Sequence, residues 1–175
     1  MASTKWAIDP THSEVTFKVK HLMISTVTGN FKIFEGTVET ETEEFSKVKN
    51  LEFKADVKSV NTNNEDRDTH LKSDDFFASE KHPNIRFTSK NFNVETGEIK
   101  GELTIKNTTK AVSLDIDFGG VVVDPYGQTK AGLTATGKIS RKEFGLVWNS
   151  VTEAGNVVVG DQIRLVAEVQ FIKQA

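Results

Sequence analysis

Histidines and the acidic residues around them are the side chains of this chain that could carry out chemistry. Asp66, His70 and Asp74 are spaced i, i+4 and i+8, which would align two carboxylates and an imidazole along one face of a helix. Such a set could hold a zinc-like ion. Arg67 and Lys72 lie among these residues, however, and the other histidines do not follow a ligand spacing such as H-E-x-x-H. We therefore predict no metal and no other cofactor.

A structural role is the alternative for the same segment. Arg67, Asp68 and His70 would then hydrogen-bond to neighbouring loops and fix the helix as a lid, because charged side chains make the stronger hydrogen bonds. In that arrangement the helix positions a site without taking part in any reaction.

Nucleophilic catalysis finds little support in the sequence. No G-x-S-x-G nucleophile elbow is present, and Ser13 and His12 are neighbours whose side chains would point to opposite faces of a strand. The chain also has no cysteine, which excludes a thiolate nucleophile and a disulfide framework. His21 stands on the apolar face of a predicted strand, where it either finds a hydrogen-bond partner in the core or binds a polar head group.

Composition narrows the class of partner. The 175 residues are about one domain long, and we expect a single domain over 1–175. With 22 Lys and Arg against 25 Asp and Glu, the net charge of −3 offers no basic surface for phosphates, so nucleic acid is an unsuitable partner. No apolar run approaches the ~18 residues of a membrane span, and the N-terminus does not read as a secretory signal. We expect a cytoplasmic location, or a periplasmic one if a leader has been removed.

The elements that must position these side chains are mainly strands. Val15, Phe17, Val19, His21 and Met23 occupy every second position, the pattern of a half-buried antiparallel strand. The same alternation predicts at least seven strands in an antiparallel meander, the others centred on Leu51-Phe53-Ala55-Val57, Ile85-Phe87, Ile99-Leu103-Ile105, Leu114-Ile116-Phe118, Leu133-Ala135 and Ile163-Leu165-Ala167-Val169-Phe171.

One helix interrupts the strands. Thr62 followed by Glu65 forms a capping-box pattern, which predicts a short helix over residues 63–73. Leu71 is its only strong hydrophobe, so the helix must lie across one end of the sheet structure rather than inside it. Phe76 and Phe77 follow directly and would cover something apolar.

What the strands enclose is open at this point. Twelve phenylalanines against one tyrosine provide large apolar surfaces with few hydroxyl groups for a sugar or nucleotide. These side chains either fill a solid core or line a hollow for an apolar ligand, as an eight-stranded barrel permits. Periodicity alone does not separate the two.

A family resemblance covers nearly the whole chain. The chain resembles the YceI-like family of lipocalin-like polyisoprenoid-binding proteins, and the match rests on the number and order of several blocks. These blocks are Trp6-Ala7-Ile8-Asp9, His12-Ser13-Glu14-Val15, Val19-Lys20-His21-Leu22-Met23, Val27 with Gly29, Phe31, Phe34 and Gly36, Arg67-Asp68-Thr69-His70-Leu71-Lys72-Ser73, Asp75-Phe76-Phe77, His82-Pro83-Asn84-Ile85, Phe87 and Ser89, Gly101-Glu102-Leu103-Thr104-Ile105, Arg141, and Phe144-Gly145.

The resemblance implies an all-β fold, an extended eight-stranded antiparallel lipocalin-like barrel with a short capping helix. It also implies an elongated cavity that takes up a long-chain amphipathic lipid, polyisoprenoid or fatty-acid-like, for binding and for storage or transport. Burial contributes about 0.8 kcal/mol per methylene, so each five-carbon prenyl unit would stabilise the complex by about 3–4 kcal/mol.

Side-chain parity then selects the residues that would contact the ligand. The predicted ligand-binding residues are Phe17, Val19, His21, Met23, Phe53, Ala55, Val57, Phe76, Phe77, Phe87, Leu103, Ile105, Leu114, Ile116 and Phe118. Two other hypotheses stay open: an enzyme acting on a hydrophobic small molecule with His21 or His70 as acid or base, and an interaction module with a filled core. Exposed barrel edges or the acidic loop formed by Glu39, Glu41, Glu43 and Glu44 could support a homodimer.

Overall fold

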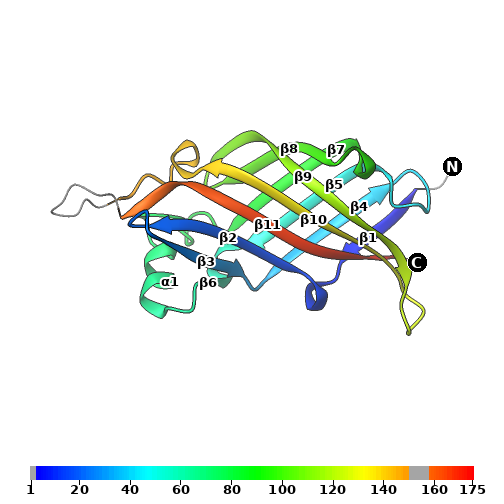
Figure 1. Cartoon of the computed structure of the whole chain (residues 1–175), viewed down its shortest axis with the longest axis horizontal. Helices are drawn as coiled ribbons and strands as arrows, with labels where there is room; N and C mark the ends of the chain where they lie inside the picture. The colour runs from blue at the N-terminus through cyan, green and yellow to red at the C-terminus, as the bar shows by residue number, and fades with distance from the viewer. Residues whose placement is uncertain (1–2, 150–157) are drawn as a thin grey trace.

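The computed structural model describes residues 3–149 and 158–175, so residues 1–2 and 150–157 of the predicted domain lie outside the described residues. The described chain forms an antiparallel sheet with one short α-helix (Figure 1). Its strands are β1 (Thr4–Ile8), β2 (Glu14–His21), β3 (Ser25–Phe31), β4 (Phe34–Thr40), β5 (Lys47–Asp56), β6 (Val60–Asn61), β7 (Asn84–Asn93), β8 (Glu98–Ile105), β9 (Thr108–Val123), β10 (Thr129–Ser140) and β11 (Val159–Lys173). The helix is α1 (Glu65–Lys72), and the 3-10 turns are η1 (Pro10–His12), η2 (Val57–Ser59), η3 (Val94–Thr96) and η4 (Arg141–Phe144).

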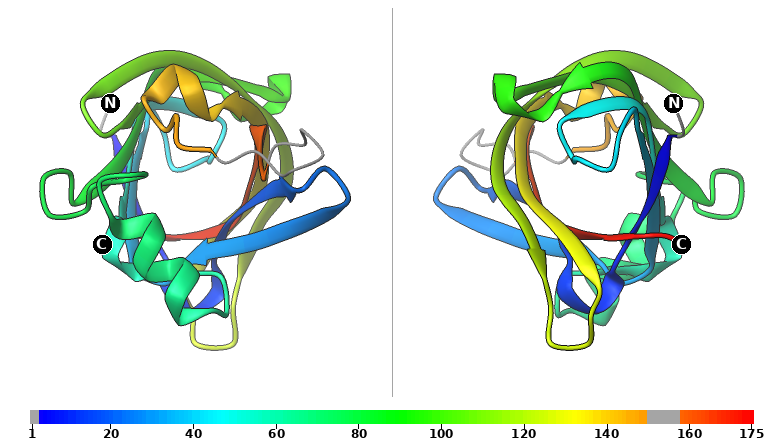
Figure 2. Two further views of the ribbon diagram at one scale, coloured as in Figure 1. Left: turned by 90° about the vertical axis from the view of Figure 1, so that its left-hand side faces the viewer. Right: turned by 90° about the vertical axis from the view of Figure 1, so that its right-hand side faces the viewer.

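The sheet closes into a barrel. Its strand order begins β1-β4-β5-β7-β8-β9-β10-β11, and β1 pairs in turn with β11 through the register Ile8↔Phe171. That ring has eight strands, as predicted, and Figure 2 shows it end-on. Closure gives the ring an inner and an outer face, so alternate residues point inward.

In two places the barrel wall is built from a pair of consecutive strands joined by a bend, β1 with β2 and β3 with β4. The turn η1 separates β1 from β2, and a break at Lys32 and Ile33 separates β3 from β4. The long strand β11 pairs with β1 near Phe171 and with β2 near Ala167, so this one strand contacts both members of the first pair. The wall therefore continues along the full length of the barrel, with β6 adding to the edge of β3.

The helix lies where it was predicted but begins differently. Its N-cap is Asn64, whose side-chain oxygen accepts a hydrogen bond from the Arg67 backbone N–H at 3.0 Å, whereas Thr62 was expected to cap it. Thr62 is occupied elsewhere, because its hydroxyl donates to the Asp68 carboxylate at 2.6 Å. Asn63 adopts a left-handed conformation with φ of 63°, so the helix cannot start before Asn64.

An aromatic cluster closes the end of the barrel opposite α1. Phe45, from the loop between β4 and β5, lies edge-on to Trp6 at 5.0 Å between ring centroids and stacks on Phe118 and Phe171 at 5.9 and 5.6 Å. The Trp6 indole N–H donates to Thr40 Oγ1 at 3.0 Å, so this fully buried ring has its polar atom satisfied. Access to the interior must therefore come from the α1 end.

Within the described residues, no helix is both long enough and apolar enough to cross a membrane.

Candidate functional site

The barrel interior contains a cavity of about 390 Å³. That volume falls in the range of small-molecule sites, roughly 300–1,000 Å³. Its walls come from β1, β2, β3, β4, β5, β7, β8, β9, β10 and β11, together with residues of α1 and of the loop that follows it. The inward side chains therefore do not meet in the middle, and the alternative of a filled core does not describe this fold.

Most of the residues selected by parity line this cavity. They are Phe17, Val19, His21, Phe53, Ala55, Phe76, Phe77, Phe87, Leu103, Ile105 and Leu114. Four selected residues, Met23, Val57, Ile116 and Phe118, are not part of the lining.

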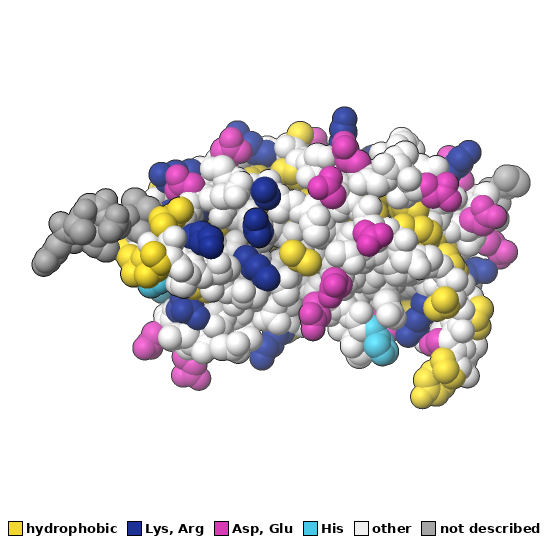
Figure 3. Space-filling view, in the orientation of Figure 1, with side chains coloured by type: hydrophobic (Ala, Val, Ile, Leu, Met, Phe, Trp, Pro, Cys, Tyr) yellow, Lys and Arg dark blue, Asp and Glu magenta, His cyan; other side chains and the backbone are white. Residues whose placement is uncertain are grey.

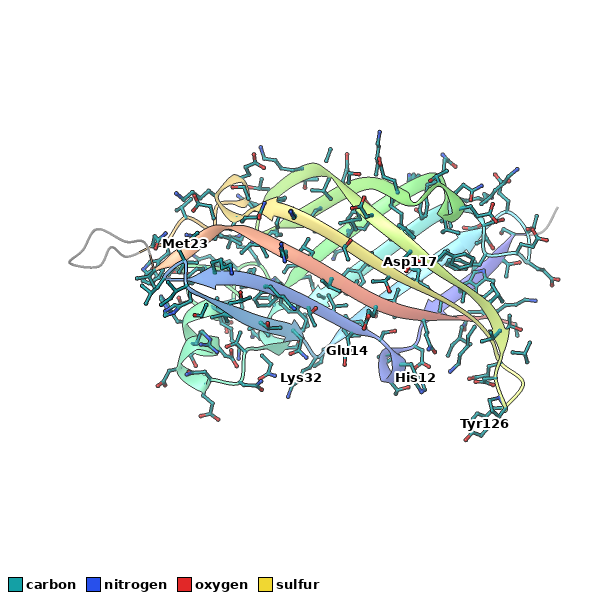
Figure 4. All side chains as sticks on the ribbon, viewed as in Figure 1. His12, Glu14, Met23, Lys32, Asp117 and Tyr126 are labelled. Atoms are coloured by element: carbon teal, nitrogen blue, oxygen red, sulfur yellow. The ribbon has the colours of Figure 1, made fainter. Side chains whose placement is uncertain are left out.

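The placement of Met23 on the cavity wall was wrong. Strand β2 ends at His21, and Leu22 and Met23 adopt positive φ angles of 53° and 60° to form the turn into β3. The period-two pattern stops at the turn, so Met23 points outward with 59% of its surface exposed. Figure 4 places it at the α1 end of the barrel.

The other three residues were misplaced for local reasons. Val57 follows the end of β5 and is buried in η2, where strand parity no longer applies. Phe118 stacks on Phe45 in the aromatic cluster that closes the far end. Ile116 is buried in the core, and its backbone N–H donates to Gly97 just after η3.

A whole wall was missed by the sequence prediction. It is formed by Leu133, Ala135 and Ile139 of β10 and by Ile163, Leu165, Ala167, Val169 and Phe171 of β11. The same alternation that selected the other residues is visible in these two strands, so parity could have found them.

Glycine in neighbouring strands leaves room for the aromatic lining. Phe17 pairs with Gly29 across β2 and β3, and a Cβ at Gly29 would collide with the Phe17 ring. Gly101 is not the pairing partner of Phe87, but a Cβ at Gly101 would likewise collide with the Phe87 ring and with the Thr88 carbonyl oxygen. Both rings can therefore lie against the wall of the barrel instead of projecting into its centre.

Polar side chains of the lining gather at the α1 end. Thr62, Arg67 and His70 lie on or beside α1, and His21 ends β2. Arg67 donates through Nε to Thr62 Oγ1 at 2.7 Å and through Nη2 to the Thr62 carbonyl oxygen at 2.6 Å. These bonds and that of Asp68 to Thr62 tie α1 to the end of β6, as the structural alternative predicted. The His21 imidazole has no hydrogen-bond partner among the described residues.

His70 sits at the centre of an aromatic group over the cavity mouth. Its ring lies edge-on to Phe76 at 5.1 Å and to Trp148 at 4.7 Å, and Phe76 and Trp148 are 5.4 Å apart. Its Nε2 pairs with Asp75 Oδ2 at 2.8 Å. Trp148 was not selected as a site residue, because it belongs to a loop in which no strand parity points to the cavity.

Arg141 holds the loop that carries Trp148. It is 2% exposed, and its guanidinium donates to the carbonyl oxygens of Gly160 (2.8 Å), Leu146 (2.5 Å) and Trp148 (2.8 Å). Burial lowers the pKa of Arg141, and the Asp161 carboxylate at 3.7 Å opposes that effect. Arginine stays protonated in proteins, so the cation holds the backbone of Leu146 and Trp148 beside Gly160 at the start of β11.

The predicted alignment of Asp66, His70 and Asp74 does not form. Helix α1 ends at Lys72, so Asp74 lies beyond it, and His70 pairs with Asp75 instead. Among residues 3–149 and 158–175, no three histidine, aspartate or glutamate side chains are grouped closely enough to hold a metal ion.

Comparison with known proteins gives consistent matches. The sequence model of the YceI-like domain matches residues 6–171. A UPF0312 protein of Staphylococcus epidermidis is 36% identical over 171 residues, which cover 96% of this chain and 97% of that protein. The crystal structure of the YceI protein of Campylobacter jejuni superposes with a TM-score of 0.71 at 32% identity, covering 89% of this chain and 90% of that one.

A more distant structure has the same fold. A polyisoprenoid binding domain from Saccharophagus degradans superposes with a TM-score of 0.73, covering 97% of this chain and 98% of that one. The identity is 13%, so this likeness bears on the fold alone.

Proposed function

The chain belongs to the YceI-like domain family, and from that premise we propose that it binds a long-chain amphipathic lipid inside the barrel, either polyisoprenoid or fatty-acid-like. The observation that carries the proposal is the apolar cavity of about 390 Å³ between the inward faces of the strands. The distant structural neighbour that is described as a polyisoprenoid binding domain agrees with this choice of ligand.

The distribution of polar groups supports one orientation of the ligand. The inner walls are formed by residues such as Phe87, Leu103 and Leu165, whereas His21, Arg67 and His70 stand at the mouth. An apolar tail would lie along the barrel toward Phe171, and the polar head would remain near α1. Shape and apolar area would hold the tail, and the few polar groups would fix the head.

No covalent step is needed for this function. Each buried methylene contributes about 0.8 kcal/mol, so a tail of ten carbons gains about 8 kcal/mol before the cost of ordering it. Slow exchange of the lipid through the mouth would suit storage, and fast exchange would suit transport.

Extraction of the purified protein tests the proposal. Freshly purified protein is extracted with organic solvent, and the extract is analysed by mass spectrometry alongside native mass spectrometry of the intact protein. We expect one stoichiometric apolar molecule per barrel. A protein that carries none, and that takes up neither a fluorescent fatty acid nor a short polyprenol, would contradict the proposal.

Catalysis on a hydrophobic small molecule is the second candidate, and the pairing of His70 with Asp75 at 2.8 Å is the observation in its favour. A carboxylate that orients an imidazole is a common arrangement for a general base. This candidate predicts a pH-dependent turnover that His70→Ala abolishes, with His21→Ala as the second variant. Binding without any conversion of the extracted molecule would rule it out.

A further inference from the structure

Exposed apolar side chains surround part of the cavity mouth. Met23 and Ile24, in the turn between β2 and β3, are 59% and 83% exposed, and Val147 is 61% exposed. The Leu22 N–H donates to the carbonyl oxygen of Val158 at 2.8 Å, and Val158 donates to the side chain of Asn149. The two loops therefore meet, and Met23, Ile24 and Val147 form an apolar rim on one side of the opening. Figure 3 shows exposed hydrophobic side chains, in yellow, gathered at this end of the molecule.

A row of cations lies on the outer face of the barrel beside this rim. Arg164 of β11 is directly opposite Lys18 of β2 and, on its other side, Lys138 of β10. All three side chains are exposed. We call Lys18, Arg164 and Lys138 the cationic strip, and in Figure 3 dark blue side chains gather over this part of the face.

Within the described residues, the cationic strip gains no stabilisation from ion pairs. Like charges that face each other on adjacent strands are destabilising. None of the three forms an ion pair with a carboxylate of the described residues, whereas Lys142 nearby pairs with Asp161 at 3.3 Å. An arrangement that costs stability and is left without counter-charges points to an anionic partner outside the protein.

Charge on this face changes sign along the barrel. Farther from the mouth, the same two strands carry Glu14 opposite Glu168. The negative side chains thus lie toward the closed end, where Figure 4 labels Glu14 and Asp117. A negatively charged surface would attract the mouth end of this face and repel the opposite end.

We propose that the apolar rim and the cationic strip dock the mouth of the barrel on a lipid bilayer that contains anionic phospholipids. Met23, Ile24 and Val147 enter the headgroup region, and Lys18, Arg164 and Lys138 contact the phosphates. The combination of apolar anchors and basic residues is that of proteins that lie on membranes. Docking rests on the proposed function, because it opens the cavity to the bilayer from which a lipid is taken or to which it is delivered.

The acidic residues of α1 determine which side of the protein would face the bilayer. Glu65, Asp66 and Asp68 lie in the first turn of α1, which stands beside β3 and β6 in Figure 1, away from β10 and β11. The bilayer therefore contacts the side of the mouth formed by β2, β10 and β11, and α1 remains on the aqueous side.

Vesicle sedimentation tests the docking. The purified protein is mixed with vesicles of phosphatidylcholine and phosphatidylglycerol at about 70:30, and with vesicles of phosphatidylcholine alone. Each basic residue near an anionic surface contributes a factor of about five in binding. The double variant Lys18→Glu/Arg164→Glu should therefore bind the anionic vesicles at least ~25-fold more weakly than the wild type. Ile24→Ser should weaken binding severalfold.

Matched controls lie away from the mouth. Lys90→Glu removes an exposed cation of β7, and Val122→Ser removes a side chain of β9 that is 64% exposed. Both should bind anionic vesicles as the wild type does. Circular dichroism checks that every variant is folded, and solvent extraction measures the lipid content of each preparation.

Several results would overturn the docking. These are equal binding of the wild type to both kinds of vesicle, unchanged binding of Lys18→Glu/Arg164→Glu, or a homodimer in sedimentation velocity that Ile24→Ser dissociates. The readouts also separate the two proposals. Lipid-loaded protein that ignores anionic vesicles contradicts the docking alone, and vesicle binding by a barrel that never holds lipid contradicts the proposed function alone.

Discussion

The imidazole of His70 lies edge-on to the indole of Trp148, with ring centroids 4.7 Å apart and an angle of 86° between the planes. His70 belongs to α1, and Trp148 belongs to the loop that Arg141 holds. The contact therefore connects two sides of the cavity mouth, and Phe76 packs against both rings. A lipid that enters the barrel as proposed would have to displace these side chains.

Removal of the indole should speed up ligand exchange. Aromatic pairs contribute about 0.5–1.5 kcal/mol beyond their buried area, so Trp148→Ala should release a bound fluorescent fatty acid several-fold faster. The release rate is measured by stopped-flow displacement. Tyr126→Ala is the control, because Tyr126 is 89% exposed in the loop between β9 and β10. Equal release rates for the two variants would show that the aromatic group does not control exchange.

Filling the cavity should block uptake. Leu103→Trp and Phe17→Trp both place a larger ring in the lining, and we expect at least about a tenfold loss of affinity for an apolar probe, because overlap with the ligand removes buried area. The measurement is fluorescence titration. Val123→Trp adds the same ring at an exposed position and should bind the probe normally. Normal affinity of both lining variants would place the ligand elsewhere.

Glycine at position 101 should be essential for packing. The added methyl group of Gly101→Ala would collide with the Thr88 carbonyl oxygen and the Phe87 ring, and overpacking of this kind costs about 1–3 kcal/mol. Urea unfolding measures the loss. Gly132→Ala is the matched control in β10, because its nearest neighbour would be the Val169 carbonyl oxygen at 3.9 Å, an ordinary contact. A similar free energy of unfolding for both variants would contradict this explanation.

Replacement of Arg141 should destabilise the rim. Arg141→Met leaves buried carbonyl oxygens of Gly160, Leu146 and Trp148 without their donor, which we expect to lower the free energy of unfolding by about 3 kcal/mol. Chemical denaturation gives the value. Lys142→Met, at the exposed neighbouring position, should change stability by less than about 0.5 kcal/mol. An Arg141→Met protein as stable as the wild type would contradict the structural role.

Stability should fall in acid because of Asp9. Burial by itself raises the pKa of this carboxyl, but hydrogen bonds from Thr11, His12 and Lys130 outweigh burial and hold the pKa well below its ordinary value. A group with a depressed folded-state pKa stabilises the protein above its unfolded pKa, about 3.9, and loses that contribution as the pH falls through the folded value. Wild type should therefore lose stability below pH ~4.

Asp9→Asn isolates this contribution. The variant should be about 1–2 kcal/mol less stable than the wild type at pH 7, because hydrogen bonds to a charged group are lost, and the difference should shrink toward pH 2. Urea denaturation at several pH values measures it. Asp117→Asn, at an exposed position of β9, is the control and should follow the wild type. A difference that does not depend on pH would contradict the assignment.

Strand parity predicted much of the cavity wall because alternation of side chains is a local property of an extended backbone. Parity alone selected Phe17, Leu103 and Leu114, and all three line the cavity. The same rule failed for Met23 and Val57, where the strand had already ended in a turn. Strand ends depend on turn geometry and on pairing with distant residues, which the spacing of hydrophobic residues does not report.

Contacts between side chains from distant parts of the chain could not be predicted from the sequence. Asp66, His70 and Asp74 have the spacing of one helix face, but α1 ends at Lys72, before Asp74. His70 instead contacts Asp75, Phe76 and Trp148. The Trp148 carbonyl oxygen is held by Arg141, which also binds the Gly160 carbonyl oxygen, so residues distant in the sequence position this loop residue beside His70.

The sequence by itself determined the all-β class, the eight-stranded barrel through its resemblance, and the inward position of most apolar residues, because these follow from local periodicity and from ordered blocks of residues. Only the tertiary structure decided that the interior is hollow. The diameter of a closed barrel depends on the number and stagger of its strands, and the volume of the inward side chains depends on their identity. Whether those side chains fill the barrel is therefore seen only in the folded structure. In this chain, the rings of Phe17 and Phe87 occupy the space that a Cβ at Gly29 or Gly101 would fill, and an aromatic cluster around Phe45 closes one end, so a cavity remains between them.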